Sequence, residues 1–162
     1  MVRSLRASGV QVGERCRIYS RNFSTEPFLV SLGDDVCVAG GVSFLTHDGA
    51  ARLLAKRRPA VQKLGRITVG NACFIGQNAL ILPGTSIGEN CIIGAGAVVS
   101  GTIPANSLVA GNPARVVGRA SLYLERLNRH PDAIDSFGLP ETERREMIVR
   151  HFAERDRAGD GQ

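Results

Sequence analysis

One histidine stands out among the residues that could perform chemistry. His47 lies in the segment 44–49 and is the single histidine before position 130. Imidazole exchanges a proton near neutral pH, so His47 is a candidate general base that would take the proton of an attacking group. An isolated histidine is more often structural, so its role depends on the elements that position it.

The cysteines are a second group of candidate nucleophiles. Cys16, Cys37, Cys73 and Cys91 form no CxxC pair. The first 13 residues contain Arg3 and Arg6 without an apolar run behind them, so we expect no signal peptide. No stretch approaches the ~20 apolar residues that cross a bilayer, so we expect no membrane span. We therefore expect reduced thiols and a cytoplasmic protein.

Basic residues are concentrated in one part of the chain. The net charge is +5, and no acidic residue occurs between Asp48 and Glu89. That interval contains six basic residues, which are Arg52, Lys56, Arg57, Arg58, Lys63 and Arg66. A stretch of this kind attracts an anionic partner. Nucleic acid, a phosphorylated cofactor and a sugar nucleotide are the candidates.

A repeat of six residues indicates what positions these groups. Aliphatic residues recur at this period, at Val69, Ile75, Ile81, Ile87, Ile93 and Val99. Glycine follows four of them, and a mostly small residue comes four places after each. The same spacing runs upstream from Leu32, with a fainter start at Val12. A helix would place apolar residues at i, i+3, i+4 and i+7, and a half-buried strand would alternate.

Three sides of six residues would close a triangular coil of about 18 residues, and stacked coils would pair as parallel strands ~4.8 Å apart. The aliphatic residues would point inward, glycine would sit where the backbone bends, and small residues would fill the corners. Cys16, Cys73 and Cys91 fall in the corner positions, so we expect buried thiols and not an acyl-carrying nucleophile. Cys37 falls one place later, where it can be exposed and reactive.

The period fails between Phe44 and Val69. Residues 50–66 show no repeat and contain Pro59 and Gly65. We predict a loop extruded from the stack of coils, with His47 at its base. A loop of this length in a compact repeat is usually functional.

Two segments resemble the hexapeptide-repeat acyltransferases. They are IGQNALILPGTSIGENCIIGAGAVV at 75–99 and VAGNPARVV at 109–117. The resemblance covers about residues 10–119 and is nearest to the sugar and polysaccharide O-acetyltransferases and the maltose and xenobiotic acetyltransferase groups. It implies an all-β, left-handed parallel β-helix over 1–119 and a homotrimer with active sites between subunits. A short helical tail would follow over 120–162, fraying at 157–162.

The resemblance also implies a reaction and its base. Members transfer an acyl group from acyl-CoA directly to an acceptor in a ternary complex, and the segment 46–49 is similar to their histidine motif. His47 would then be the general base. In an 18-residue coil Leu29 would lie beneath it, and Asp48 would point away. Glu26 lies on the same earlier coil, in a segment (23–30) that resembles a second family motif, and we assign it as the orienting partner or an acceptor ligand.

Coenzyme A contacts follow from the same resemblance. The pantetheine arm would run along the later coils, with Ala97 and Ser100 as contacts. The backbone near Asn78 and Ala79 would supply oxyanion donors. Arg115 and Arg119 would meet a phosphate, although Arg115 could also be a surface cation. No metal and no nucleic acid are expected.

Three alternatives remain beside an acetyl-CoA-dependent transfer to a sugar hydroxyl. A γ-class carbonic anhydrase shares the fold but needs three histidines for zinc, and His130 and His151 fall in the tail. A non-catalytic scaffold would need neither His47 nor the loop. An amino-sugar N-acyltransferase would use the same fold and chemistry, and the basic loop would suit an anionic acceptor.

Overall fold

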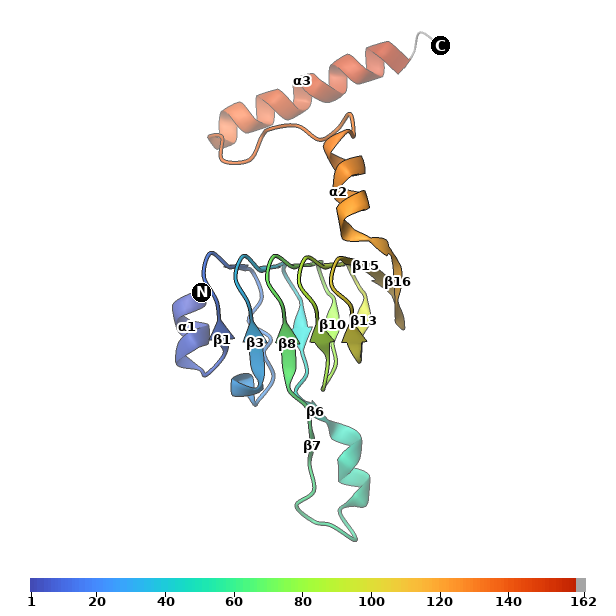
Figure 1. The fold of residues 1–162 in the computed structure, drawn as a ribbon. Coiled ribbons are helices and arrows are strands. Elements are labelled where there is room, and N and C mark those ends of the chain that lie inside the picture. The colour runs from blue at the N-terminus through green and yellow to red at the C-terminus, as the bar shows by residue number, and fades with distance from the viewer. Residues whose placement is uncertain (160–162) are drawn as a thin grey trace. The chain divides into compact units, whose positions relative to one another are not determined.

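The computed structural model describes residues 1–159. The chain divides into two compact units, Met1–Glu125 and Arg126–Gln162. The first unit is a stack of three-sided coils built from strands of two or three residues (Figure 1). In the second unit the main element is α3 (Glu141–Gly159). Residues 157–159, at the start of the segment expected to fray, belong to this helix, and residues 160–162 lie outside the described part.

The three sides of the coils form three sheets. The first contains, in order, β1 (Gln11–Val12), β3 (Val30–Leu32), β8 (Ile67–Val69), β11 (Ser86–Ile87) and β14 (Thr102–Ile103). The second contains β5 (Ser43–Phe44), β10 (Leu80–Ile81) and β13 (Val98–Val99). The third contains β2 (Arg17–Ile18), β4 (Cys37–Val38), β9 (Phe74–Ile75), β12 (Ile92–Ile93), β15 (Ser107–Gly111) and β16 (Ala114–Arg119). Neighbouring strands are parallel except β16, which returns antiparallel to β15, so the third sheet is mixed.

The core confirms the period of six. Thr68 pairs with Ser86, which lies 18 positions later, so Val69 stacks directly on Ile87. All six predicted aliphatic positions between 69 and 99 are buried, as are Cys73 and Cys91 in the corners. Cys16 and Cys37 are half-buried. The large aliphatic side chains therefore fill one continuous column inside the coils.

The predicted role of the repeat glycines needs correction. Gly76 does not have a positive φ, whereas Asn78, two residues later, does at 58°. The bend is made by residues such as Asn78, because asparagine tolerates the left-handed region. A Cβ on Gly76 would lie 2.6 Å from the backbone nitrogen of Ala95 on the next coil. Glycine is required at this position because the coils approach closely, and not because the chain turns there.

Two elements extend beyond the repeat in the first unit. Helix α1 (Val2–Ala7), which the sequence did not predict, lies against β1 with Leu5 buried (Figure 1). Leu80 lies 37 positions after its partner Ser43, compared with 18 between Leu80 and Val98, so one coil contains 19 extra residues. These leave the coils through β6 (His47–Asp48), form the 3-10 helix η2 (Gly49–Leu54) and return through β7 (Lys63–Leu64) (Figure 1).

Helix α2 (Ala120–Asn128) follows directly on β16. None of the helices described is both long and apolar enough to cross a membrane.

Candidate active site

A short antiparallel ladder fixes the base of the extruded loop. His47 pairs with Leu64, and Asp48 pairs with Lys63. The preceding residue, Thr46, is fully buried, and its carbonyl accepts a hydrogen bond from Gly65 N at 2.8 Å. The sequence predicted the loop but not this ladder. As a result, His47 is held on a paired strand and not on a free loop.

The register of the first coil brings Glu26 beneath His47. Asn22 forms a parallel bridge with Ser43, which lies 21 positions later. The same offset of 21 positions separates the residues that follow each of them by four places. These residues are Glu26 and His47. Leu29, expected there from an 18-residue coil, instead ends the 3-10 helix η1 (Pro27–Leu29), so that expectation was wrong. The first coil is longer because it accommodates η1 before β3 begins.

Glu26 and His47 are joined by a hydrogen bond. His47 Nδ1 lies 3.0 Å from Glu26 Oε2. The same carboxylate accepts hydrogen bonds from Thr46 Oγ1 at 2.6 Å and from Thr25 Oγ1 at 2.7 Å. These bonds from Thr46, Thr25 and His47, in decreasing order, lower the pKa of Glu26 from 4.5 to about 2. Glu26 is therefore ionised at neutral pH and can only accept hydrogen bonds.

This carboxylate determines the tautomer of the histidine. An ionised acceptor at Nδ1 favours the proton on Nδ1 and leaves the lone pair on Nε2. Ser24 Oγ, at 3.4 Å, also faces Nδ1. Within residues 1–159, no hydrogen bond is made by Nε2. The His47 side chain is 41% exposed and that of Glu26 is 18% exposed, so the imidazole is open to a ligand while its partner is more enclosed.

A cavity of about 450 Å³ opens between His47 and the loop. Arg52, Arg58 and Gln62 contribute polar side chains to it, and much of the remaining lining is alanine, glycine and proline. Asp48 also lines it, with Oδ1 accepting from Ala50 N and Oδ2 from Lys63 Nζ. The hydrogen bond from Ala50 and then that from Lys63 lower the pKa of Asp48. A volume of this order is typical of small-molecule sites.

The predicted oxyanion donors are already occupied. Asn78 N donates to Gly40 O at 3.1 Å, and Ala79 N donates to Gly76 O at 3.2 Å. The first bond joins two coils, and the second closes the corner at which Asn78 takes its positive φ, so neither of these two N–H groups is free to bind an oxyanion. The side chain of Ala79 is buried in the core, and so is that of Ala97, whose N–H also donates to Gly94 O. Neither alanine offers a side-chain contact to a cofactor.

The other three predicted coenzyme contacts are exposed. Ser100 follows β13, and Arg115 and Arg119 lie on β16. Arg115 Nη1 donates to the carbonyl of Ala114. None of the three lines the cavity beside His47. The structure thus brings Glu26 and His47 together and leaves these residues on a separate part of the coils.

Sequence reasoning missed the hydroxyl groups that hold the carboxylate. Thr25 is adjacent to Glu26, and Thr46 is adjacent to His47. A hydroxyl residue beside each member of the proposed pair was the available signal. It could not be interpreted without the register of the first coil.

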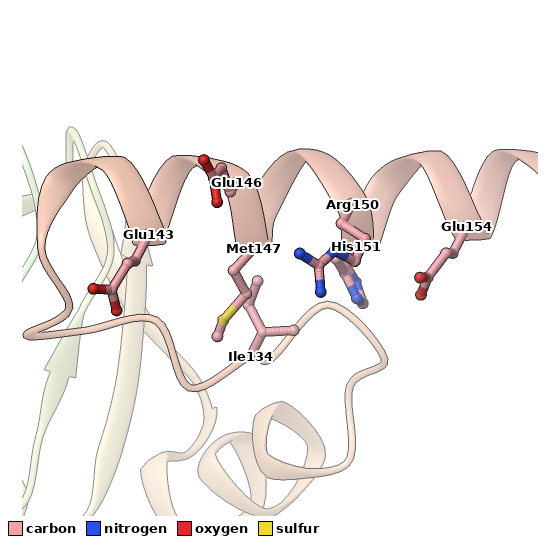
Figure 2. Close-up of a pocket in the computed structure, with 7 residues that line it drawn as sticks. All are labelled: Ile134, Glu143, Glu146, Met147, Arg150, His151 and Glu154. Carbon is pink, nitrogen blue, oxygen red and sulfur yellow. The ribbon is translucent and has the colours of Figure 1, made fainter.

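A second hollow lies wholly within the second unit. Figure 2 shows it between α3 and the segment that carries Ile134, lined by Met147, His151 and charged residues of the helix. Its histidine is engaged, because His151 Nε2 lies 3.1 Å from Asp132 Oδ1, an oxygen that also accepts from Arg155. Among the described residues, no group of three or more histidine, cysteine or acidic side chains could hold a metal.

Three-sided coils with a period of six define the class of hexapeptide-repeat β-helices. Residues 66–101 match the family described as bacterial transferase hexapeptide, six repeats. The chain is 40% identical over 131 residues to Protein CapG of Staphylococcus aureus, covering 79% of this chain and 76% of that protein. It therefore belongs to the hexapeptide-repeat transferase family, and the resemblance seen in the sequence is confirmed.

Further relatives extend the comparison. The chain is 34% identical over 113 residues to galactoside O-acetyltransferase of Escherichia coli, covering 68% of this chain and 54% of that protein. It spans about half the length of that relative. Among solved structures, a galactoside acetyltransferase in complex with coenzyme A matches with a TM-score of 0.57 at 30% identity, covering 70% of this chain and 56% of that one.

A hexapeptide-repeat acetyltransferase of Vibrio cholerae complexed with acetyl coenzyme A also matches with a TM-score of 0.57, at 26% identity, covering 69% of this chain and 61% of that one. Structural neighbours of this family imply the left-handed winding that the resemblance predicted.

Proposed function

We propose that this chain is an acetyl-CoA-dependent O-acetyltransferase acting on a sugar or saccharide, with His47 as general base and Glu26 as its positioning residue. One observation carries the proposal, the 3.0 Å hydrogen bond between His47 Nδ1 and Glu26 Oε2 beside the loop cavity. The relatives support the class of reaction, because they include a galactoside O-acetyltransferase and structures complexed with coenzyme A and acetyl coenzyme A.

The reaction follows from the free Nε2. An acceptor hydroxyl donates to Nε2, and as the oxygen attacks the thioester carbonyl its proton passes to His47. The ionised Glu26 stabilises the imidazolium without taking the proton itself. The carbon–sulfur bond then breaks, and the imidazolium returns the proton to the departing sulfur. The products are an acetyl ester and coenzyme A, and no covalent enzyme intermediate forms.

The edge of the second sheet is the best candidate to hold the pantetheine arm. β13 is an outer strand of that sheet, so within residues 1–159 its outward backbone groups have no partner strand there. Such groups can pair with the amides of an extended ligand, as in strand addition. Ser100 directly follows this strand and adds an exposed hydroxyl. Arg115 and Arg119 provide guanidinium groups for the phosphates.

The outward residues of the third sheet support a homotrimer. The outward column of this sheet begins with Arg17 and is apolar from there on, at Cys37, Phe74, Ile92 and Leu108. The corresponding column of the first sheet is polar, namely Gln11, Ser31, Thr68, Ser86 and Thr102. Apolar patches on a soluble protein mark interaction surfaces. We infer that the third sheet faces other copies of the chain, while the first sheet faces water.

The four free cysteines support a cytoplasmic setting, because reduced thiols persist there.

The proposed activity is tested by incubating the protein with acetyl-CoA and a panel of sugars, amino sugars and saccharides. We expect a sugar product whose mass is increased by one acetyl group. Mild base should remove this acetyl group, because esters are hydrolysed under these conditions. An acetyl group that resists mild base would indicate an amide and would favour amino-group transfer instead.

A further inference from the structure

The cavity beside His47 has an unbalanced positive charge. Arg52 and Arg58 line it, and among the described residues neither makes an ion pair or a side-chain hydrogen bond. The acidic residue in the lining, Asp48, is engaged by Ala50 N and Lys63 Nζ. Two arginines therefore line one small cavity together with the candidate base, and neither has an ion-pair partner within residues 1–159.

The geometry suits an acceptor that carries an anion. Guanidinium groups bind carboxylate and phosphate through paired hydrogen bonds. Gly49, Ala51 and Ala60 add little bulk to the lining, and the volume of about 450 Å³ leaves room for a small ligand. The side chain of Gln62 adds donor and acceptor groups that suit sugar hydroxyls.

We propose that this cavity is the acceptor site and that Arg52 and Arg58 select a saccharide bearing an anionic group, either a carboxylate or a phosphate. This proposal names the class of acceptor for the function given above, and acetylation of the bound saccharide depends on that function. Binding of the anion itself does not depend on it. The anion would be held by the loop, and a hydroxyl of the same molecule would face Nε2 of His47.

The loop also provides a matched control. Lys56 and Arg57 lie on the same loop and are exposed, but neither lines the cavity. The double variant Arg52→Ala/Arg58→Ala and the double variant Lys56→Ala/Arg57→Ala remove the same net charge. All four residues are exposed outside the core, so both variants should keep the unfolding midpoint of the wild type.

The test is calorimetric titration of wild type and both variants with four galactose derivatives that differ in charge. The probes are methyl galactoside, galacturonate, galactose 1-phosphate and UDP-galactose, with acetyl-CoA titrated separately. We expect an anionic derivative to bind wild type at least about tenfold more tightly than methyl galactoside. Arg52→Ala/Arg58→Ala should weaken that binding by about tenfold or more, while Lys56→Ala/Arg57→Ala should change it by less than about threefold.

Whether galacturonate or the phosphate compounds bind best distinguishes the carboxylate from the phosphate. Three results would overturn the proposal. These are equal binding of neutral and anionic sugars, an equal loss in both double variants, and a loss of acetyl-CoA binding in place of sugar binding in Arg52→Ala/Arg58→Ala.

Acetyl transfer is measured on the same samples. Arginine-dependent binding of an anionic sugar without any transfer would remove the proposed function and keep the anion site. Equal transfer to neutral and anionic sugars would support the proposed acetyl transfer and rule out selection of the acceptor by its anionic group.

Discussion

Thr46 donates its hydroxyl hydrogen to Glu26 Oε2 over 2.6 Å, from one coil to the coil before it. Thr46 is fully buried, so the packed core fixes the carboxylate. The same oxygen lies 3.0 Å from His47 Nδ1. The core therefore holds Thr46, Thr46 holds the carboxylate of Glu26, and this carboxylate orients His47.

The first prediction concerns the charge on Glu26. Its pKa is lowered from 4.5 to about 2, first of all by the hydrogen bond from Thr46. The stabilisation from the ionised form is fully present above about pH 4.5 and is lost as the pH falls through about 2. Glu26→Gln should therefore lower the urea midpoint at about pH 6, and this difference should shrink as the pH falls from about 4.5 to about 2.

A matched control for this effect is Glu89→Gln on another coil, because the carboxylate of Glu89 accepts no hydrogen bond in the described part of the chain. It should leave the midpoint nearly unchanged. A Glu26→Gln difference that is independent of pH would show that the carboxylate charge does not stabilise the fold.

The second prediction concerns the spacing of the coils. A Cβ at position 76 would lie 2.6 Å from Ala95 N, so Gly76→Ala should force the coils apart and destabilise the protein by about 1–3 kcal/mol. At Gly40 an added Cβ meets nothing within 4 Å. Gly40→Ala should therefore have a much smaller effect on urea unfolding. Equal effects of the two substitutions would contradict the close approach of the coils at Gly76.

The third prediction concerns self-association. Phe74 is 44% exposed in the apolar column of the third sheet. Light scattering should give the wild type a mass three times the 17.3 kDa of the chain. Phe74→Asp should reduce it to that of a single chain, because a charge would be buried without a partner. Thr68→Asp on the polar column should leave the wild-type mass unchanged, and dissociation by both variants alike would argue against the assigned face.

The fourth prediction concerns the cysteines. Burial is the main cause that raises the pKa of Cys73 to about 11, and burial also raises the pKa of Cys16. A thiol reagent at neutral pH should leave Cys73 and Cys91 unmodified until the protein is unfolded, as mass spectrometry of digests can measure. Cys37 lies in the apolar column assigned to self-association, so it should react slowly in the assembled wild type and faster in the single-chain Phe74→Asp variant. Cys37→Ser should keep its acetyl transfer. A loss of transfer in Cys37→Ser would instead indicate an acyl-cysteine route.

The interior of the coils could be predicted from the sequence, because the same packing requirement recurs in every coil. Each aliphatic residue, such as Ile75 or Ile93, must fill the same space as its copies one coil away, so the period of six appears directly in the chain. The loop was visible for the converse reason, since the period fails there. Helix α1 was not predicted because its one buried side chain, Leu5, leaves no periodic signal.

The site could be predicted only in part. His47 was found from its residue type and its place at the loop base. The register that brings Glu26 to it depends on the length of the first coil, which η1 increases beyond 18 residues. The N–H groups of Asn78 and Ala79 are engaged, the first by a neighbouring coil and the second within its own corner, and residue type does not reveal such backbone hydrogen bonds.

The most direct test of the proposed mechanism compares acetyl transfer by wild type, His47→Ala and His130→Ala, with acetyl-CoA binding measured on the same samples. Removing a general base should lower kcat by roughly 10²–10⁴-fold, while acetyl-CoA binding stays unchanged and His130→Ala, in the second unit, retains full activity. If His47→Ala transfers acetyl as fast as the wild type, another group takes the proton, and the assignment built on the Glu26–His47 pair is wrong.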